Sequence, residues 1–197
     1  KYMEESMKRL FELDELARRD GTRRTRKRAA YDAIAKTRGR AFIGIVGPRG
    51  VGKTVLLRQL AVNEEHSFYM SLDALGDADL FDTARTLADR YGIRLLLLDE
   101  VHFLKGYEAA LKKIFDFLDL RVVFTSSVAL SLFQSAHDLS RRVRLHRLYP
   151  FSFGEYLRFR ESADLAPLTL EDILQRRWTP QHERWGYRFE DYLRGGL

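Results

Sequence analysis

The chain has 197 residues, of which 45% are hydrophobic and 31% charged, with a formal net charge of +6. This composition excludes wholesale disorder and suits one well-cored domain with a small addition. No apolar run approaches the roughly 20 residues of a transmembrane helix, so no membrane partner is expected. The absence of cysteine excludes disulfides and thiol catalysis, which fits a cytoplasmic protein. The chain begins without a secretory signal or an initiator Met, which is consistent with a fragment or a processed form.

The first 38 residues are predicted to form a helical, basic arm. Apolar residues from Met3 to Leu10 recur at helical spacing, and acidic residues precede basic ones by four positions. Gly21 is predicted to end this helix in a turn. The stretch 18–28 holds seven basic residues and one acidic residue. It could bind the backbone of DNA or RNA, or it could be a solvated linker around the turn.

Residues 39–150 predict a three-layer α/β core. Continuous apolar runs of strand length alternate with segments of helical periodicity, and such strands suit a parallel sheet that is buried on both faces. Strands are predicted over 41–46, 66–72, 93–98, 121–127 and 144–148, and helices over 53–63, 77–92, 108–118 and 128–135; a further short helix is predicted over 29–36, in the arm.

Residues 151–197 are predicted to form a helical lid and the start of a further domain. Segments 152–161, 169–178 and 182–193 have helix-like spacing and are separated by breaks that contain proline. Trp178 and Trp185 are interpreted as core residues of this lid rather than as a base-stacking site.

The strongest motif is GPRGVGKT, residues 47–54, which matches G-x-x-x-x-G-K-[ST] in full between a predicted strand and a predicted helix. Glycines at this spacing let the backbone wrap a phosphate chain and direct its N–H groups inward, and the helix adds its positive end. Lys53 is predicted to reach the phosphates of ATP or ADP, and the Thr54 hydroxyl to bind Mg²⁺. The predicted nucleotide-binding residues are Gly47, Pro48, Arg49, Gly50, Val51, Gly52, Lys53, Thr54 and Val55.

A second motif is LLLLDE, residues 95–100, in which two acids follow a buried strand. Ligands bind at the carboxyl ends of strands in open α/β sheets, so these acids are expected beside the phosphate loop. Asp99 is predicted to hold Mg²⁺, and Glu100 to activate the attacking water as a general base. His102 is interpreted as a packing or supporting residue.

A third motif is RVVFTSS, residues 121–127, a predicted strand that ends in Thr125, Ser126 and Ser127. These hydroxyls could face a γ-phosphate or the attacking water, or they could be ordinary turn and cap residues.

The order of GPRGVGKT, SLD, LLLLDEVHFL, VVFTSS, LSRR and LYPFSFGEYL resembles the AAA+-type P-loop ATPase domain of archaeal and bacterial ATPases. In this family a second C-terminal domain often follows. The resemblance covers about 41–157, and LYPFSFGEYL is the part that points to this family. It implies an ASCE-type parallel sheet ordered 5-1-4-3-2 with a helical lid. The ending FEDYLRGGL is similar to the junction where the second domain of the family begins.

The resemblance also implies two further catalytic positions. Ser126 or Ser127 would take the sensor-1 role. Arg142 would be an arginine finger that contacts the nucleotide bound to a neighbour in a homo-oligomer. The family usually has Gly-Arg here, whereas this chain has Arg141 and Arg142, so Arg141, Arg142 and Arg144 remain candidates. A solvated basic helix end is the alternative.

These patterns predict Mg²⁺-dependent binding and hydrolysis of ATP, which would drive a conformational change in a partner or attached domain. Three alternatives remain: a nucleotide-operated switch with little hydrolysis, a nucleic-acid-dependent ATPase that uses the basic stretch, and a small-molecule kinase. Glu100 beside Asp99 favours water activation over the kinase.

Overall fold

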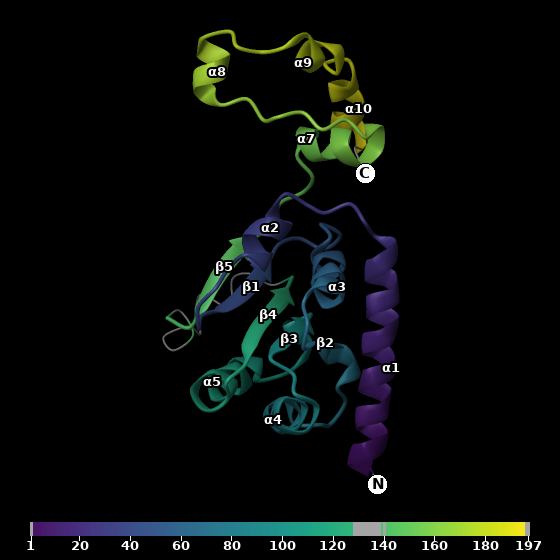
Figure 1. Ribbon diagram of the computed structural model, residues 1–197, viewed down its shortest axis with the longest axis vertical. Coiled ribbons are helices and arrows are strands. Elements are labelled where there is room, and N and C mark those ends of the chain that lie inside the picture. Colours follow the sequence, from purple (N-terminus) through teal and green to yellow (C-terminus); the bar gives the residue numbers. More distant parts are fainter. Residues whose placement is uncertain (1, 128–138, 140, 196–197) are drawn as a thin grey trace. The chain divides into compact units, whose positions relative to one another are not determined.

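The computed structural model describes residues 2–127, 139 and 141–195 (Figure 1). The chain folds into two compact units, residues 1–148 and residues 149–197. The first contains both the predicted arm and the predicted core, and the second contains the predicted lid. The predicted helix over 128–135 lies outside the described residues.

The first unit contains a five-stranded sheet in which every neighbouring pair is parallel. Its order is β2-β3-β4-β1-β5, which is 5-1-4-3-2 when it is read from the β5 edge. The strands are β1 (Phe42–Val46), β2 (Ser67–Ser71), β3 (Leu95–Asp99), β4 (Arg121–Ser126) and β5 (Val143–Arg147). The described helices of this unit are α1 (Tyr2–Arg23), α2 (Ala30–Ala35), α3 (Lys53–Asn63), η1 (Leu72–Ala74), α4 (Leu80–Tyr91), η2 (Val101–Phe103) and α5 (Tyr107–Phe117).

Two hydrophobic clusters fill the space on either side of this sheet. One joins alternate strand residues such as Phe68 and Phe124 to Leu87 of α4 and Ile114 of α5. The other joins the intervening strand residues to α2 and α3. Helices therefore cover both faces of the sheet, and the unit has three layers, as the continuous apolar runs predict.

Helix α1 covers the β2 edge of the sheet (Figure 1). Asp14 accepts a hydrogen bond of 2.8 Å from the backbone N–H of Tyr69, and Arg18 donates to the backbone carbonyl of Ser67. Asp14 and Arg18 also form an ion pair with each other at 2.8 Å. The helix thus satisfies polar groups that an edge strand would otherwise leave unpaired.

The prediction of a turn at Gly21 is wrong, because α1 continues through this residue to Arg23. A Cβ at Gly21 would lie 2.3 Å from the carbonyl oxygen of Arg58 in α3. Glycine is required here by the close approach of two helices rather than by a turn. The interpretation of 18–28 as a linker around that turn is therefore also wrong for its helical half.

The second unit contains short helices and little core. They are α7 (Phe153–Tyr156), a π-helical turn η3 (Leu157–Glu161), α8 (Leu170–Leu174), α9 (Pro180–Arg184) and α10 (Arg188–Gly195). Among its described residues only Glu155, Tyr156 and Leu157 are buried. The predicted helix over 182–193 is interrupted around Gly186.

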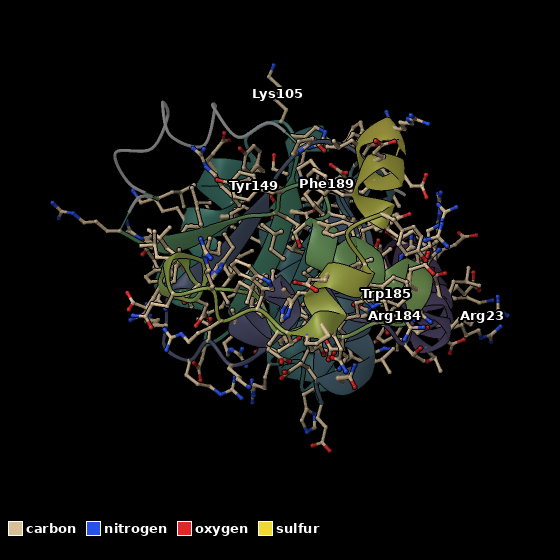
Figure 2. All side chains as sticks on the ribbon, turned by 90° about the horizontal axis from the view of Figure 1, so that it is seen from above. Arg23, Lys105, Tyr149, Arg184, Trp185 and Phe189 are labelled. Atoms are coloured by element: carbon tan, nitrogen blue, oxygen red, sulfur yellow. The ribbon has the colours of Figure 1, made fainter. Side chains whose placement is uncertain are left out.

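The interpretation of Trp178 as a core residue is wrong, because 40% of it is exposed. Trp185, which follows the last residue of α9, is partly exposed, and Phe189 of α10 is 46% exposed. Both residues are labelled in Figure 2. A unit of this size has too little interior to bury so many aromatic side chains.

We predict that Gly21→Ala lowers the free energy of unfolding by roughly 1–3 kcal/mol, because the new methyl group must push α1 away from α3. Chemical denaturation measures this change. Gly154→Ala is the matched control, since a Cβ at Gly154 meets no atom within 4 Å. Equal stabilities of the two variants would contradict the close-packing role of Gly21.

Candidate active site

The glycine-rich loop connects the carboxyl end of β1 to the start of α3. Gly50 and Gly52 have φ values of +85° and +93°, in the region that favours glycine. A Cβ on Gly47 would lie 2.2 Å from the carbonyl oxygen of Leu148. The first glycine is thus required for close packing, and the other two for the backbone path of the loop.

The start of α3 presents backbone N–H groups without a side-chain cap. Its N-cap residue is Gly52, which has no side chain to accept from them. The first N–H groups of a helix have no partner within the helix, and the helix dipole adds partial positive charge there. Lys53, Thr54 and Val55 therefore begin the helix at a place suited to an anionic group.

Lys53 is 3% exposed, and its ammonium group donates to the carbonyl oxygens of Gly47 and Pro48, at 2.9 Å each. Burial lowers the pKa of Lys53, while the nearby carboxylates of Glu100 and Asp99 oppose this shift. The lysine thus lies within the electrostatic reach of both predicted acids.

Asp99 ends β3 and is 2% exposed. Its two carboxylate oxygens accept hydrogen bonds from different strands. The Tyr69 hydroxyl of β2 donates to Oδ2 at 2.8 Å, and the Thr125 hydroxyl of β4 donates to Oδ1. The carboxylate is consequently held from both sides within the sheet.

Glu100 follows with φ of +52°, which is uncommon for a residue with a side chain. Its backbone N–H donates to the Thr125 hydroxyl at 2.8 Å, so this one threonine orients both acids. The Ser127 hydroxyl donates to Oε2 of the Glu100 carboxylate at 3.2 Å, and Nδ1 of His102 also lies 3.2 Å from this oxygen. His102 thus lies beside the acid that is predicted to be the general base.

Ser126 is fully buried at the end of β4, where it pairs with Val46, the last residue of β1 before the loop. Thr125 and Ser127, on either side of it, contact the acids directly. The role predicted for Ser126 stays a prediction.

Arg142 lies at the other end of the sheet. Its carbonyl oxygen accepts from the N–H of Phe42, the first residue of β1, whereas the glycine-rich loop follows the last. Its guanidinium binds Asp116 at 3.1 Å and lies over the ring of Phe115. The structure therefore does not bring Arg142 to the loop of its own chain.

Sequence reasoning missed Tyr69, which contributes to the site from β2. The available signal was a phenol within the apolar strand FYM, because a buried tyrosine hydroxyl usually requires a partner. The pairing of β2 with β3 places Ser71 opposite Asp99 and Tyr69 opposite Leu97, near the acid.

The residues at this site fit Mg²⁺. The Thr54 hydroxyl and the Asp99 carboxylate are hard oxygen ligands, which Mg²⁺ prefers. Within the described part of the chain, no group of three or more His, Asp or Glu residues could hold a metal ion. Such a site would suit an ion that takes its remaining ligands from phosphate and water.

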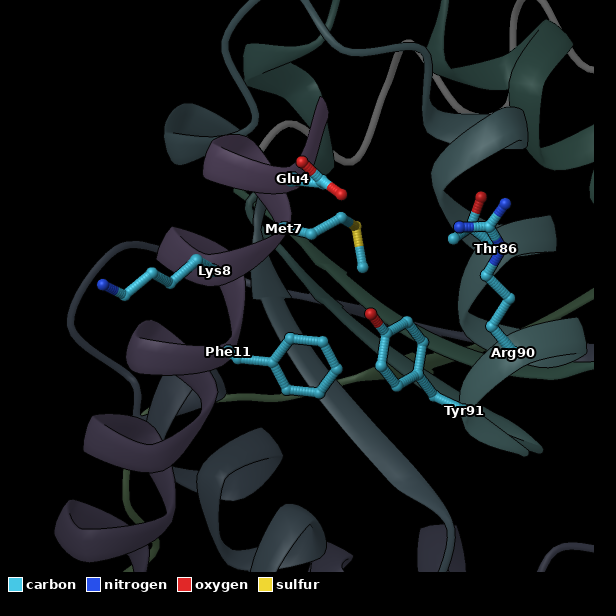
Figure 3. Close-up of a pocket in the computed structure, with 7 residues that line it drawn as sticks. All are labelled: Glu4, Met7, Lys8, Phe11, Thr86, Arg90 and Tyr91. Atoms are coloured by element: carbon cyan, nitrogen blue, oxygen red, sulfur yellow. The ribbon is translucent and has the colours of Figure 1, made fainter. Parts of the chain in front are cut away.

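A separate pocket of about 330 Å³ lies between α1 and α4. Met7, Phe11 and Tyr91 form its apolar lining, and Glu4, Lys8 and Arg90 surround them (Figure 3). None of the predicted site residues lines this pocket, so it is not the nucleotide site.

A parallel sheet with a glycine-rich loop after β1 and acids after β3 defines the class of P-loop nucleotide-binding domains. Comparison with known families agrees. A family model described as an AAA domain matches residues 39–157, which is more than half of the chain. The chain therefore belongs to the AAA domain family, whose members are ATPase-like nucleotide-binding domains.

A relative of this chain is an uncharacterized protein of Methanocaldococcus jannaschii. The two are 33% identical over an alignment of 147 residues, and the match covers 68% of this chain and 31% of the relative. The chain thus spans about a third of the length of this relative. No helix in the described part of the structure has the length and apolarity to cross a membrane.

We predict that Tyr69 makes stability fall at alkaline pH. Burial, and next the Asp99 carboxylate, raise the pKa of Tyr69 above its ordinary value of 10.0. Below pH 10 both states keep the phenol proton, whereas above it only the unfolded chain releases it. The contribution of Tyr69 is therefore full below this pH and decreases above it, by at most about 1.4 kcal/mol per pH unit.

Denaturant unfolding of wild type and Tyr69→Phe between about pH 9 and 11 measures this effect. The stability of Tyr69→Phe should decrease less steeply than that of wild type. Tyr91→Phe is the control, because Tyr91 is 49% exposed. Parallel curves for wild type and Tyr69→Phe would show that the folded protein does not raise the pKa of this phenol.

Proposed function

We propose that this domain binds ATP with Mg²⁺ and hydrolyses it to ADP and phosphate. The observation that carries the proposal is geometric: β4 pairs with the strand that precedes the glycine-rich loop, and Thr125 of β4 binds both Asp99 and the backbone of Glu100. The uncapped start of α3 and Lys53 follow that loop. Binding and acid groups that lie on separate segments of the sequence are adjacent at one edge of the sheet.

The loop and Lys53 would bind the triphosphate. The N–H groups from Gly50 to Val55 supply donors, and the Lys53 ammonium would exchange its bonds to the Gly47 and Pro48 carbonyls for bonds to phosphate oxygens. Thr54 and Asp99 would hold Mg²⁺, which neutralises phosphate charge and orients the transferring group.

Glu100 would take a proton from the attacking water as a general base. Its carboxylate is positioned by the Ser127 hydroxyl and by its own backbone, which Thr125 anchors. Nδ1 of His102 lies 3.2 Å from an oxygen of the same carboxylate. In this proposal Ser126 contributes to the γ-phosphate side of the site, because it ends the strand next to the loop.

We further propose that turnover drives a conformational change in an attached or partner domain. The matched segment is 31% of the relative, which leaves length in that protein for a further domain. In the second unit, apolar side chains such as Leu170 and Leu174 are each 72% exposed, which favours contact with another protein surface.

We expect Lys53→Ala to weaken binding of ATP by about 10- to 100-fold, since a buried charge-assisted contact is lost. Glu100→Gln should bind ATP and lower its turnover by about 10²–10⁴. Calorimetric titration with and without Mg²⁺ and a phosphate-release assay measure both effects. Lys105→Ala and Glu65→Gln, which change exposed side chains in the same way, are the matched controls.

The outcomes separate the alternatives. Binding by wild type without phosphate release, alone or with a partner domain, would replace hydrolysis by a nucleotide-operated switch. Stimulation of turnover by DNA or RNA with a steep salt dependence would favour a nucleic-acid-dependent ATPase. Absence of nucleotide binding would reject the proposal.

Arg142 is proposed to act on the nucleotide of a neighbouring copy, because it lies at the end of its own sheet opposite the loop. Arg142→Ala should leave ATP binding unchanged and lower turnover by about 10³-fold or more, which is the contribution of an arginine finger. Asp116→Ala is the matched control, because it removes the same ion pair and keeps the arginine. Equal turnover of the two variants would show that Arg142 contributes only through its ion pair with Asp116.

A further inference from the structure

Arg28 is a buried arginine outside the segment that the AAA domain model matches. It is 8% exposed, although it belongs to a basic stretch whose other members are largely solvated. Its guanidinium Nη1 donates a hydrogen bond of 2.6 Å to the carbonyl oxygen of Val51. Val51 lies within the glycine-rich loop, so a residue of the N-terminal arm contacts the backbone of the proposed phosphate site.

The segment that carries Arg28 is fixed to the helix that follows the loop. The buried side-chain amide of Gln59 in α3 donates to the carbonyl oxygens of Arg24 and Arg26, at 2.6 and 2.9 Å. Asp20, near the end of α1, pairs with Arg58 of α3 at 2.9 Å. These contacts hold the chain on the N-terminal side of Arg28 against α3, so the guanidinium has a defined approach to the loop.

The hydrogen bond to Val51 determines the direction of a neighbouring donor. A trans peptide unit is planar, and its C=O and N–H bonds point in opposite directions. When Arg28 holds the Val51 carbonyl, the N–H of Gly52 in the same peptide unit must point away from Arg28. Gly52 has a φ of +93°, and without a Cβ the peptide units around it have more conformational freedom than at other residues. A hydrogen bond to the Val51 carbonyl therefore restricts a peptide plane that glycine leaves freer than other residues would.

We propose that Arg28 is a positioning residue for the phosphate loop, which fixes the 51–52 peptide plane so that the Gly52 N–H is directed at a bound phosphate. This inference rests on the proposed nucleotide site. It gives the arm a role that neither nucleic-acid binding nor a linker would require. The positive charge of Arg28 also lies at the loop, where it favours an anion.

The test compares three variants of the full chain by calorimetric titration with Mg²⁺-ADP, which avoids turnover. Arg28→Ala should raise the Kd by about tenfold, because the charge-assisted hydrogen bond that orients the 51–52 peptide is lost. Arg28→Lys keeps the charge and one donor, and its Kd should lie between those of wild type and Arg28→Ala. Arg23→Ala, which removes an exposed arginine at the end of α1 (Figure 2), should bind as wild type does.

A second measurement reports the orientation of the 51–52 peptide plane through the amide resonance of Gly52. In ¹⁵N-labelled protein, the amide resonance of Gly52 should shift strongly when ADP binds to wild type, and less in Arg28→Lys. A merely structural role would lower the midpoint of thermal unfolding of the variants without changing this shift. If Arg28→Ala does not fold, Arg28→Lys carries both measurements.

ADP affinity and a Gly52 shift like those of wild type in the Arg28 variants would overturn this inference and leave the proposed function intact. Equal weakening by Arg23→Ala would also overturn it, because general charge would then explain the effect. Failure of wild type to bind ADP or ATP would reject both.

Discussion

All five strands point the same way, and the candidate site depends on this constraint. In a parallel sheet the carboxyl ends of the strands share one edge. Because β4 lies between β1 and β3, its end is adjacent to both the glycine-rich loop and the acidic pair. Thr125 can thus bind Asp99 and Glu100 together, while Ser126 pairs with the residue before the loop. A different strand order would separate these groups.

The same sheet has an edge at β2 that must be covered, and α1 provides the cover. Asp14 and Arg18 bind opposite kinds of backbone group, one N–H and one carbonyl, and they neutralise each other as an ion pair. Met7 and Leu10 of α1 enter the cluster on one face of the sheet, and Ala17 enters the cluster on the other. The arm is consequently part of the domain core, and its continuation is fixed near the loop through Gln59 and Arg28.

The loop and acids could be predicted because their chemistry depends on short, contiguous motifs. GPRGVGKT follows directly after the last residue of β1, and LLLLDE contains the whole of β3 and the residue after it, so each predicted set of site residues is contiguous with a strand end. The sheet order, which the resemblance implied, is found in the structure when it is read from β5. In contrast, nothing near Tyr69 in the sequence indicates Asp99, since the contact exists only because β2 and β3 pair in a particular register.

The sequence by itself determined the alternation of strands and helices, the glycine-rich loop and the acidic pair, because local periodicity and glycine spacing encode them. Only the tertiary structure decided the conformation and the burial of residues 18–28. Gly21 continues a helix because α3 approaches too closely for a side chain, and Arg28 is buried because the folded chain brings a loop carbonyl within its reach. Both outcomes depend on contacts between residues more than 20 positions apart, and such contacts leave no periodic signal in the sequence.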